Sequence, residues 1–202
     1  MNKHVFILAM CAVMIAGCAK NPFSTRGTEP PIGAAGTWET PHSPEAVVGN
    51  LLNAYNEHVI SNYQLCFSDS FLFSSPEDSI DATAGGRPYL FLDWNKQTEV
   101  SVSTSIFITF SNSDTMKQYL ILYPASGHVD QINYTDAILY RDYSIQTVMT
   151  HAGIPDTTNY HGQATFHLIQ ETLSWWTIQW WEDLPAQSGA LDWGDFKAEY
   201  RQ

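Results

Sequence analysis

The stretch His161–Asp183, HGQATFHLIQETLSWWTIQWWED, is the part of this sequence that decides its fold. Two runs rich in β-branched and aromatic residues flank a short polar segment at Glu171–Ser174, a pattern that predicts two strands joined by a turn. The second run has the spacing W-x-I-x-x-W-x-D, and four of the seven tryptophans lie within seven positions: Trp175, Trp176, Trp180 and Trp181. We expect this hairpin to form the wall against which the rest of the domain packs.

Before the hairpin, the sequence predicts helices first. Ser43, Pro44 and Glu45 combine a residue that caps helices, a proline suited to the first helical position and an acid in the first turn. Apolar residues then repeat at helical spacing, at Val48, Leu51, Leu52, Tyr55 and Val59. Ser61–Asp69 favours a second, shorter helix, and Ser70–Ser74 favours a first strand.

The middle of the chain predicts loops and strands. Ser75–Arg87 is polar and contains glycine, and we expect a loop there and another at Gly153–Asn159. Strands are expected at Tyr119–Tyr123, Ala137–Tyr140 and Tyr143–Met149, and a short terminal helix at Asp192–Tyr200. Helices followed by a run of antiparallel strands indicate an α+β fold with a curved sheet that folds over the helices.

One segment gives conflicting signals. Apolar residues from Val100 to Phe110 alternate with serine and threonine, which by periodicity predicts a strand. The preceding residues Trp94–Glu99 are better suited to a helix.

Residues 1–18 have the pattern of a bacterial lipoprotein signal. Lys3 precedes the apolar run Val5–Ile15, which is too short for a transmembrane helix but has the size of a signal-peptide core. Ile15-Ala16-Gly17-Cys18 resembles a lipobox, which implies that Cys18 is acylated and becomes the mature N-terminus; an ordinary secretory peptide with a chance cysteine is the alternative. Ala19 is not the Asp typical of inner-membrane retention, so the outer membrane is favoured.

The sequence therefore divides into a signal peptide over residues 1–17, a lipidated cysteine with a flexible tether over residues 18–42, and a domain over residues 43–202. Without the signal peptide, 8 Lys and Arg face 21 Asp and Glu, a net charge of −13. Such a surface disfavours nucleic acid, so the expected partner is a membrane, reached through the acylated Cys18. Cys66 has no cysteine to pair with, and we expect a small buried residue rather than a reactive thiol.

Several of these residues resemble one family. The segments Ser43–Tyr55 and Tyr63–Phe71 resemble the helical start of nuclear transport factor 2-like (SnoaL-like) domains, and Trp176–Asp183 resembles their last strand. The ending Trp193-Gly194-x-Phe196-Lys197 is similar to endings of bacterial lipoproteins of this group. The resemblance implies a cone, in which a bent antiparallel sheet wraps around three N-terminal helices and a cavity lies between them. It also implies a helix at Trp94–Ser103, against the local strand pattern.

Enzymes of this superfamily place two or three polar groups inside the cone, but none of their motifs transfers to this sequence residue by residue. In the first strand of the hairpin, His167 alternates with Phe166 and Leu168, so they face opposite sides. If His167 points inward, it is the best candidate for an acid, a base or a ligand contact. If Phe166 and Leu168 form the core, His167 belongs to a polar outer surface, which is the better interpretation. The ligand-binding candidates are Tyr63, Asp93, Tyr140 and His167.

Other kinds of site have weaker signals. His151 and His161 are ten residues apart without a third ligand nearby, so surface histidines explain them better than a metal site, and no metal or cofactor is expected. The tryptophans could stack on a carbohydrate, but packing on the two faces of a sheet explains them as well.

Three functions remain open. The first is a non-catalytic envelope lipoprotein whose cone binds a small apolar ligand or a protein partner. The second is an isomerase, dehydratase or cyclase that uses His167, which rests on fold analogy alone. The third is a structural subunit that forms a homodimer through the sheet, with Trp175 or Trp180 in the contact.

Overall fold

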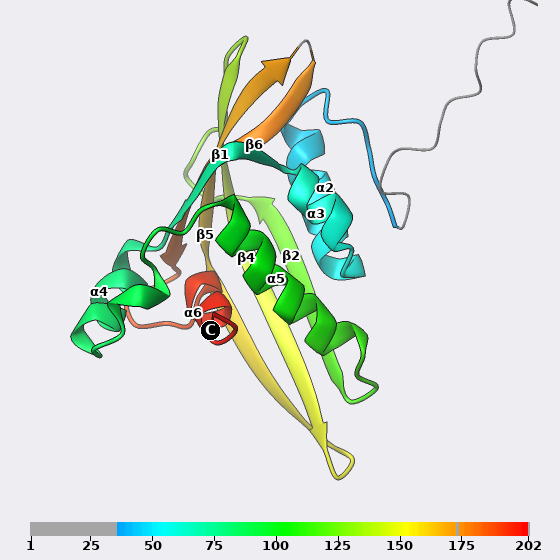
Figure 1. Cartoon of the computed structure of the whole chain (residues 1–202), viewed down its shortest axis with the longest axis vertical. Coiled ribbons are helices and arrows are strands. Elements are labelled where there is room, and N and C mark those ends of the chain that lie inside the picture. Colours follow the sequence, from blue (N-terminus) through cyan, green and yellow to red (C-terminus); the bar gives the residue numbers. More distant parts are fainter. Residues whose placement is uncertain (1–35, 173, 202) are drawn as a thin grey trace, which may run out of the picture. The chain divides into compact units, whose positions relative to one another are not determined.

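The structure, a computed structural model, describes residues 36–172 and 174–201 (Figure 1). The chain separates into the units Met1–Ile32 and Gly33–Gln202, and every described residue belongs to the second. The predicted signal peptide, Cys18 and most of the predicted tether therefore lie outside the described residues. Within the described part, every helix is too short or too polar to cross a membrane.

Within residues 36–172 and 174–201, the domain has six helical segments and six strands. The helical segments are α2 (Pro44–Glu57), α3 (Ile60–Leu65), α4 (Pro76–Ala84), the 3₁₀ turn η1 (Pro88–Leu90), α5 (Lys96–Ser111) and α6 (Trp193–Ala198). The strands are β1 (Phe67–Ser74), β2 (Met116–Pro124), β3 (Gln131–Ile132), β4 (Asp136–His151), β5 (Ile154–Thr172) and β6 (Trp175–Pro185). They form one curved sheet in the order β1-β6-β5-β4-β2, with β3 paired to β4, and α2, α3, α5 and α6 lie on one side of it (Figure 1).

The predicted tryptophan hairpin is confirmed as β5 and β6. Phe166 pairs with Trp181 and Leu168 with Ile178, and all four side chains are at most 1 % exposed. These residues face the helices, because side chains alternate between the two sides of a strand. The hairpin is the central wall of the core, as expected.

The conflict between strand and helix is resolved in favour of the helix α5, which is longer than predicted. Its buried residues follow helical spacing: Glu99, Val102, Ser103, Ile106, Phe107 and Phe110. Asn95 caps the helix by accepting the N–H of Thr98 at 3.1 Å. The serines and threonines that suggested a strand bond back to the preceding turn, as Thr104 does to the carbonyl of Val100 at 2.6 Å.

The loop predicted at Ser75–Arg87 is wrong, because Pro76–Ala84 form α4. Ser75, Pro76 and Glu77 repeat the start signal that correctly identified α2, with a proline at the first helical position and acids in the first turn. The glycines that suggested a loop follow the helix and end it.

Three strand boundaries also differ from the prediction. The loop expected at Gly153–Asn159 is wrong, because β4 and β5 meet in a two-residue turn at Ala152 and Gly153, both with positive φ. The two strands expected before it are one continuous strand, β4. The second helix ends at Leu65, and β1 begins at Phe67.

The sheet is mixed rather than purely antiparallel. Strand β1 runs parallel to β6, with Phe67 opposite Ile178 and Leu72 opposite Trp180, whereas the other neighbouring strands are antiparallel. The connection from the end of β1 at Ser74 to the start of β6 at Trp175 contains α4, α5 and the other four strands, so it is long enough for a parallel pairing, which a tight turn cannot make. The α+β class and the curved sheet over helices are otherwise as predicted.

Candidate functional site

Helix α6 fills the interior in which the resemblance implies a cavity. Asp192 caps its N-terminus, and Trp193, with no exposed surface, packs its ring edge-on against three aromatic rings. The centroid distances are 5.1 Å to Tyr55, 5.2 Å to Tyr143 and 4.4 Å to Trp181. The indole N–H donates to the hydroxyl of Tyr55 at 3.1 Å, so the polar atom of this side chain also has a partner inside the domain.

One turn further along α6, the charged side chain of Lys197 is fully buried. Its Nζ lies 3.1 Å from the carboxylate of Glu99, and 3.4 Å and 3.8 Å from the ring centroids of Trp181 and Phe73. Burial lowers the pKa of Lys197, while the charge of Glu99 opposes this shift. The ion pair and the two aromatic rings offset part of the cost of burying an ammonium.

The carboxylate of Glu99 receives hydrogen bonds from four side chains. Tyr63 donates at 2.5 Å, Trp94 at 2.7 Å, Ser103 at 3.3 Å and Lys197 at 3.1 Å. A carboxylate offers about four lone-pair positions, so Glu99 has none left to take a proton from a substrate. This buried network fixes α6 to α5.

Asp183, at the end of the W-x-I-x-x-W-x-D motif, is the second buried acid of the interior. Its Oδ2 accepts the backbone N–H of Gly194 at 2.9 Å and the hydroxyl of Tyr143 at 3.2 Å. Its Oδ1 has no hydrogen-bond partner in the described part of the chain. Burial raises the pKa of Asp183 to about 7, and the charge of Lys197 limits the rise. Asp183 therefore holds a proton in a large fraction of molecules near neutral pH.

The structure places His167 on the outer face of the sheet, away from the helices. Its neighbours Phe166 and Leu168 point into the core, so alternation turns the imidazole outward. The ring stacks on Trp180, with centroids 4.5 Å apart and an interplanar angle of 27°. Burial under this stack lowers the pKa of His167. An acid/base role for His167 inside the cone thus has no geometric support.

The other candidates for ligand binding do not meet His167. Tyr63 lies in the core and donates to Glu99. Tyr140 lies on the outer face, where its ring stacks on His128 with centroids 4.9 Å apart. Asp93 occupies an exposed turn before α5 with a left-handed φ of 52°. The four residues therefore do not form one pocket.

The two histidines considered as a metal pair are far apart. His161 lies opposite Ser144 in the sheet, and His151 is seven residues further along β4. At about 3.3 Å per strand residue, this separates the two histidines by roughly 23 Å.

Cys66 is buried, as predicted from its apolar neighbours. Its thiol donates to the carbonyl of Asn62 at 3.5 Å, and burial raises its pKa. A thiol that stays protonated is a poor nucleophile, so Cys66 behaves as a small core residue.

Apolar side chains cross the outer face of the sheet. The register aligns Leu72, Trp180, His167 and Ile138 in one row over four strands. On the edge strand β2, three further side chains are about half exposed and point the same way, because they lie opposite outward residues of β4. We call the following residues the outer apolar surface: Leu72, Tyr119, Ile121, Tyr123, Ile138 and Trp180.

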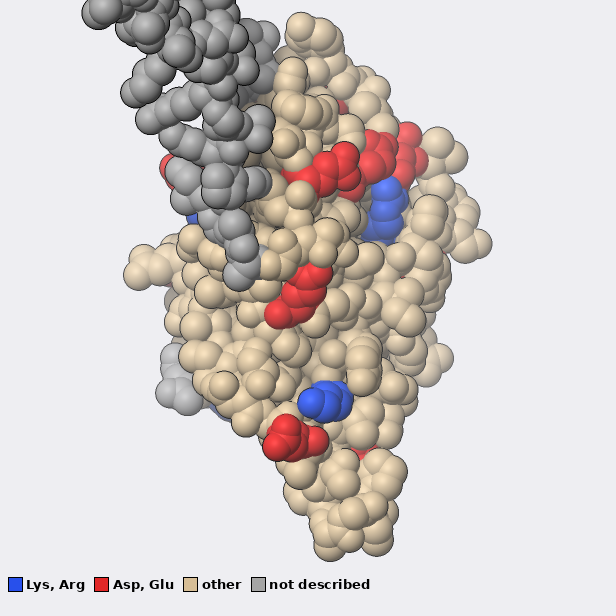
Figure 2. Space-filling view, turned by 90° about the vertical axis from the view of Figure 1, so that its right-hand side faces the viewer, with Lys and Arg blue, Asp and Glu red and all other residues tan. Residues whose placement is uncertain are grey.

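The charged side chains of the outer face are mostly acidic. Alternation along the strands brings Lys117, Asp136, Asp142, Glu171 and Glu182 to this side, among long stretches of Ser, Thr, Asn, Gln and aromatic residues. Figure 2 shows the side of the domain on which α2 and α3 lie. Single Lys and Arg side chains are scattered there among Asp and Glu on a mostly uncharged surface.

Glu99 and Lys197 were missed as interacting residues in the sequence. A signal was present, because Glu99 shares its helix face with Val102 and Ile106, and Lys197 follows Phe196 in an apolar ending. A charged residue within an apolar stripe is rarely buried without a partner. These two positions therefore indicate that each charged side chain needs a buried partner, but the sequence does not say that the partner of Glu99 is Lys197.

No protein-family model matches this sequence, and no curated protein matches it significantly. Solved structures do resemble the domain. The Kfla4162 protein from Kribbella flavida is 11% identical, with 76% of this chain and 92% of that chain covered and a TM-score of 0.52.

Two further similar structures have lower scores. A nuclear transport factor 2 (NTF2-like) superfamily protein from Salmonella enterica is 14% identical, covering 71% of this chain and 89% of that chain, with a TM-score of 0.47. A ketosteroid isomerase-like protein from Erwinia carotovora is 16% identical, covering 74% and 98%, with a TM-score of 0.44. At such identities the likeness concerns the fold and not the activity. The order and arrangement of the helices and strands agree with the cone-type α+β fold that the sequence predicts from its resemblance to nuclear transport factor 2-like (SnoaL-like) proteins, and the likeness to the Kfla4162 protein supports this fold.

Proposed function

We propose that this chain is a lipid-anchored protein of the bacterial cell envelope and that its domain is a non-catalytic binding module. The anchor is Cys18, acylated after removal of residues 1–17, in the outer membrane. The binding surface is the outer face of the sheet, and the partner is a second copy of this chain.

The filled interior is the observation that carries the non-catalytic part of the proposal. Trp193, Phe196 and Lys197 of α6 are at most 1 % exposed and lie where a ligand of the cone would bind. Glu99, which pairs with Lys197, has all its acceptor positions in use. Asp183 keeps one carboxylate oxygen without a partner in the described residues, but this side chain has no exposed surface and lies against the start of α6. A small apolar ligand, or the substrate of an isomerase or dehydratase, would have to displace α6 to reach it.

The outer apolar surface supports a partner on the sheet. Ile121 and Leu72 are 59 % and 55 % exposed on the two edge strands, and Trp180 lies beside Leu72. Ile121 lies opposite Ser144, six residues along β4 from Ile138, so the β2 residues form a second patch of the same face, about 20 Å away along the strands. A second copy fits this face because a twofold contact would cover the apolar side chains of both copies at once, although the four acids on this face repel their counterparts. A twofold contact would place β2 and β6 of both copies in one interface.

The anchor is tested by growing cells with a radiolabelled fatty acid. The wild-type chain should carry label and sediment with the outer membrane, whereas Cys18→Ser should carry none and keep its signal peptide. Label on the Cys18→Ser variant, or an unlabelled wild-type chain, would remove the lipoprotein proposal.

The dimer is tested by sedimentation equilibrium of the chain from Gly33 onward. We expect a dimer at micromolar concentration and a monomer for Ile121→Asp, which puts a charge into the proposed contact. Val129→Asp is the matched control, because Val129 is 82 % exposed in a loop outside the sheet. A wild-type monomer at 100-fold higher concentration would refute the dimer.

A further inference from the structure

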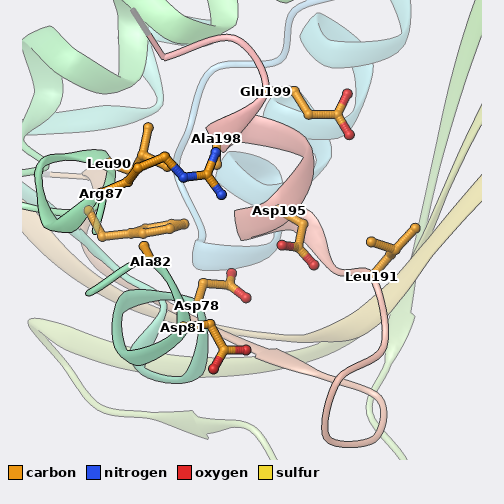
Figure 3. A pocket seen from close by; sticks show the side chains of 10 residues that line it. Asp78, Asp81, Ala82, Arg87, Leu90, Leu191, Asp195, Ala198 and Glu199 are labelled. Atoms are coloured by element: carbon orange, nitrogen blue, oxygen red, sulfur yellow. The ribbon is translucent and has the colours of Figure 1, made fainter. Parts of the chain in front are cut away.

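Three aspartates from two separate parts of the chain meet between α4 and α6. Asp78 lies in the first turn of α4, Asp192 caps α6 and Asp195 lies in its first turn. One carboxylate oxygen from each lies within 4.8 Å of the others. The carboxylates of Asp78 and Asp195 are turned toward each other in the space between the two helices (Figure 3). This cluster lies apart from the outer apolar surface, whereas Lys197 and Asp183 are close enough to interact with it electrostatically.

The central carboxylate lacks a donor for one of its oxygens. Asp192 has no exposed surface; its Oδ1 accepts the N–H of Asp195 at 3.0 Å, and its Oδ2 has no donor in the described residues other than the carboxyl group of Asp78, which donates only when protonated. A buried oxygen of an acid is costly when it is left unpaired. The oxygen therefore calls for a proton or a cation among the three carboxylates.

We propose that Asp78, Asp192 and Asp195 bind a calcium ion that joins α4 to α6. All three ligands are carboxylate oxygens, which hard divalent cations prefer. Calcium accepts oxygens at about 2.3–2.6 Å in flexible geometry, so two ligands of one ion can be up to about 5 Å apart. The spacing of the cluster lies within this limit. The site is independent of the proposed membrane anchor and of the proposed dimer.

A cavity beside the cluster gives a hydrated ion access. It measures about 250 Å³, is open to solvent and has Asp78, Asp81, Asp195 and Glu199 in its wall (Figure 3). These four acids attract a cation, and the open side leaves room for the waters that complete calcium coordination. Arg87 also lines the cavity, but in the described part of the chain it forms no ion pair with the cluster.

The ion would affect the interior through α6. This helix carries Trp193 and Lys197 into the core, and α4 lies beside it. Calcium would thus stabilise the filled form of the cone by holding the start of α6 against α4. A ligand that binds only the folded state raises the unfolding temperature.

The test uses the full chain purified in detergent and freed of metals with EDTA. Isothermal titration with CaCl2 should show one ion per chain with a Kd in the range of about 10⁻⁵–10⁻³ M. Calcium at 10 mM should raise the Tm by about 3–16 °C over this range of Kd. Asp192→Asn should abolish both effects while keeping a good helix cap. Asp114→Asn, at an exposed position in the α5–β2 loop, is the matched control and should keep both.

The possible outcomes separate calcium from its alternatives. Absence of binding and of a Tm rise in the wild-type chain overturns the site. So does a calcium response that Asp192→Asn retains, because this indicates non-specific surface binding. A third result would combine a wild-type chain without a calcium response and an Asp192→Asn variant that is more stable than the wild-type chain in EDTA. This result overturns the calcium site and indicates that the aspartates share a proton. An equal response to MgCl2 overturns the assignment to calcium. If Asp192→Asn does not fold, Asp195→Asn takes its place.

Discussion

The ammonium of Lys197 lies 3.1 Å from the carboxylate of Glu99, and neither side chain has any exposed surface. Lys197 belongs to the last helix and Glu99 to α5, 98 residues earlier. The pair therefore joins the end of the chain to the helical layer inside the domain. A buried charge that loses its partner cannot be solvated by water, so removal of either residue is costly.

Lys197→Met should lower the free energy of unfolding by about 3–5 kcal/mol, because Glu99 then stays buried without its countercharge. The control is Lys96→Met, which removes an ion pair with the fully exposed Asp69 and should cost less than about 1 kcal/mol. Denaturant unfolding of both variants gives the comparison. Glu99→Gln added to Lys197→Met should recover part of the loss. Similar losses for Lys197→Met and Lys96→Met would mean that the buried pair is not important for stability.

Substitution of two glycines by alanine should change the stability of the domain in opposite directions. A Cβ at Gly194 would overlap with the carboxylate of Asp78 and come within 2.8 Å of the hydroxyl of Ser75, so Gly194→Ala should cost about 1–3 kcal/mol. A Cβ at Gly49, within α2, meets no atom within 4 Å, so Gly49→Ala should gain about 0.5–1 kcal/mol. Thermal unfolding measures both. A stabilising Gly194→Ala would show that α4 and α6 are not packed this closely.

The free energy of unfolding should fall as the pH rises, because Asp183 loses its proton. Its pKa in the folded domain, about 7, lies above the ordinary value of 3.8, so the folded state holds the proton more tightly. This contribution to stability is fully present below about pH 3.8 and is lost as the pH rises through 7. We expect the Tm in EDTA to be lower at pH 8 than at pH 5, and Asp183→Asn to reduce the difference. An unchanged difference in the variant would exclude Asp183 as its source.

Cys66 should be protected from thiol reagents in the folded domain. The chain from Gly33 onward contains no other cysteine, so a colorimetric disulfide reagent reports on Cys66 alone. Burial keeps the thiol protonated and out of contact with the reagent, and we expect a reaction at least about 100-fold slower than in the unfolded chain. Rapid labelling without unfolding would contradict the buried position.

The local pattern failed where a sequence signal had two interpretations. Segment Val100–Phe110 alternates like a strand, yet it forms part of α5, because its residues also repeat at helical spacing and that spacing faces the core. The sequence also contains a helix start signal at Ser75, but the glycines that follow favoured the prediction of a loop. In the structure these glycines come after α4 and end it. In both cases the burial of one face, which depends on the rest of the fold, decided the outcome.

The sequence by itself determined the hairpin of β5 and β6, the capped start of α2 and the α+β class, because strand alternation, helix caps and apolar spacing are local properties. Tertiary structure alone decided that His167 faces outward, that Glu99 receives Lys197, and that Asp78 lies beside Asp192 and Asp195. The reason is physical: a strand pattern specifies two faces but not which of them is covered. Partners about a hundred residues apart meet only when the whole chain has packed.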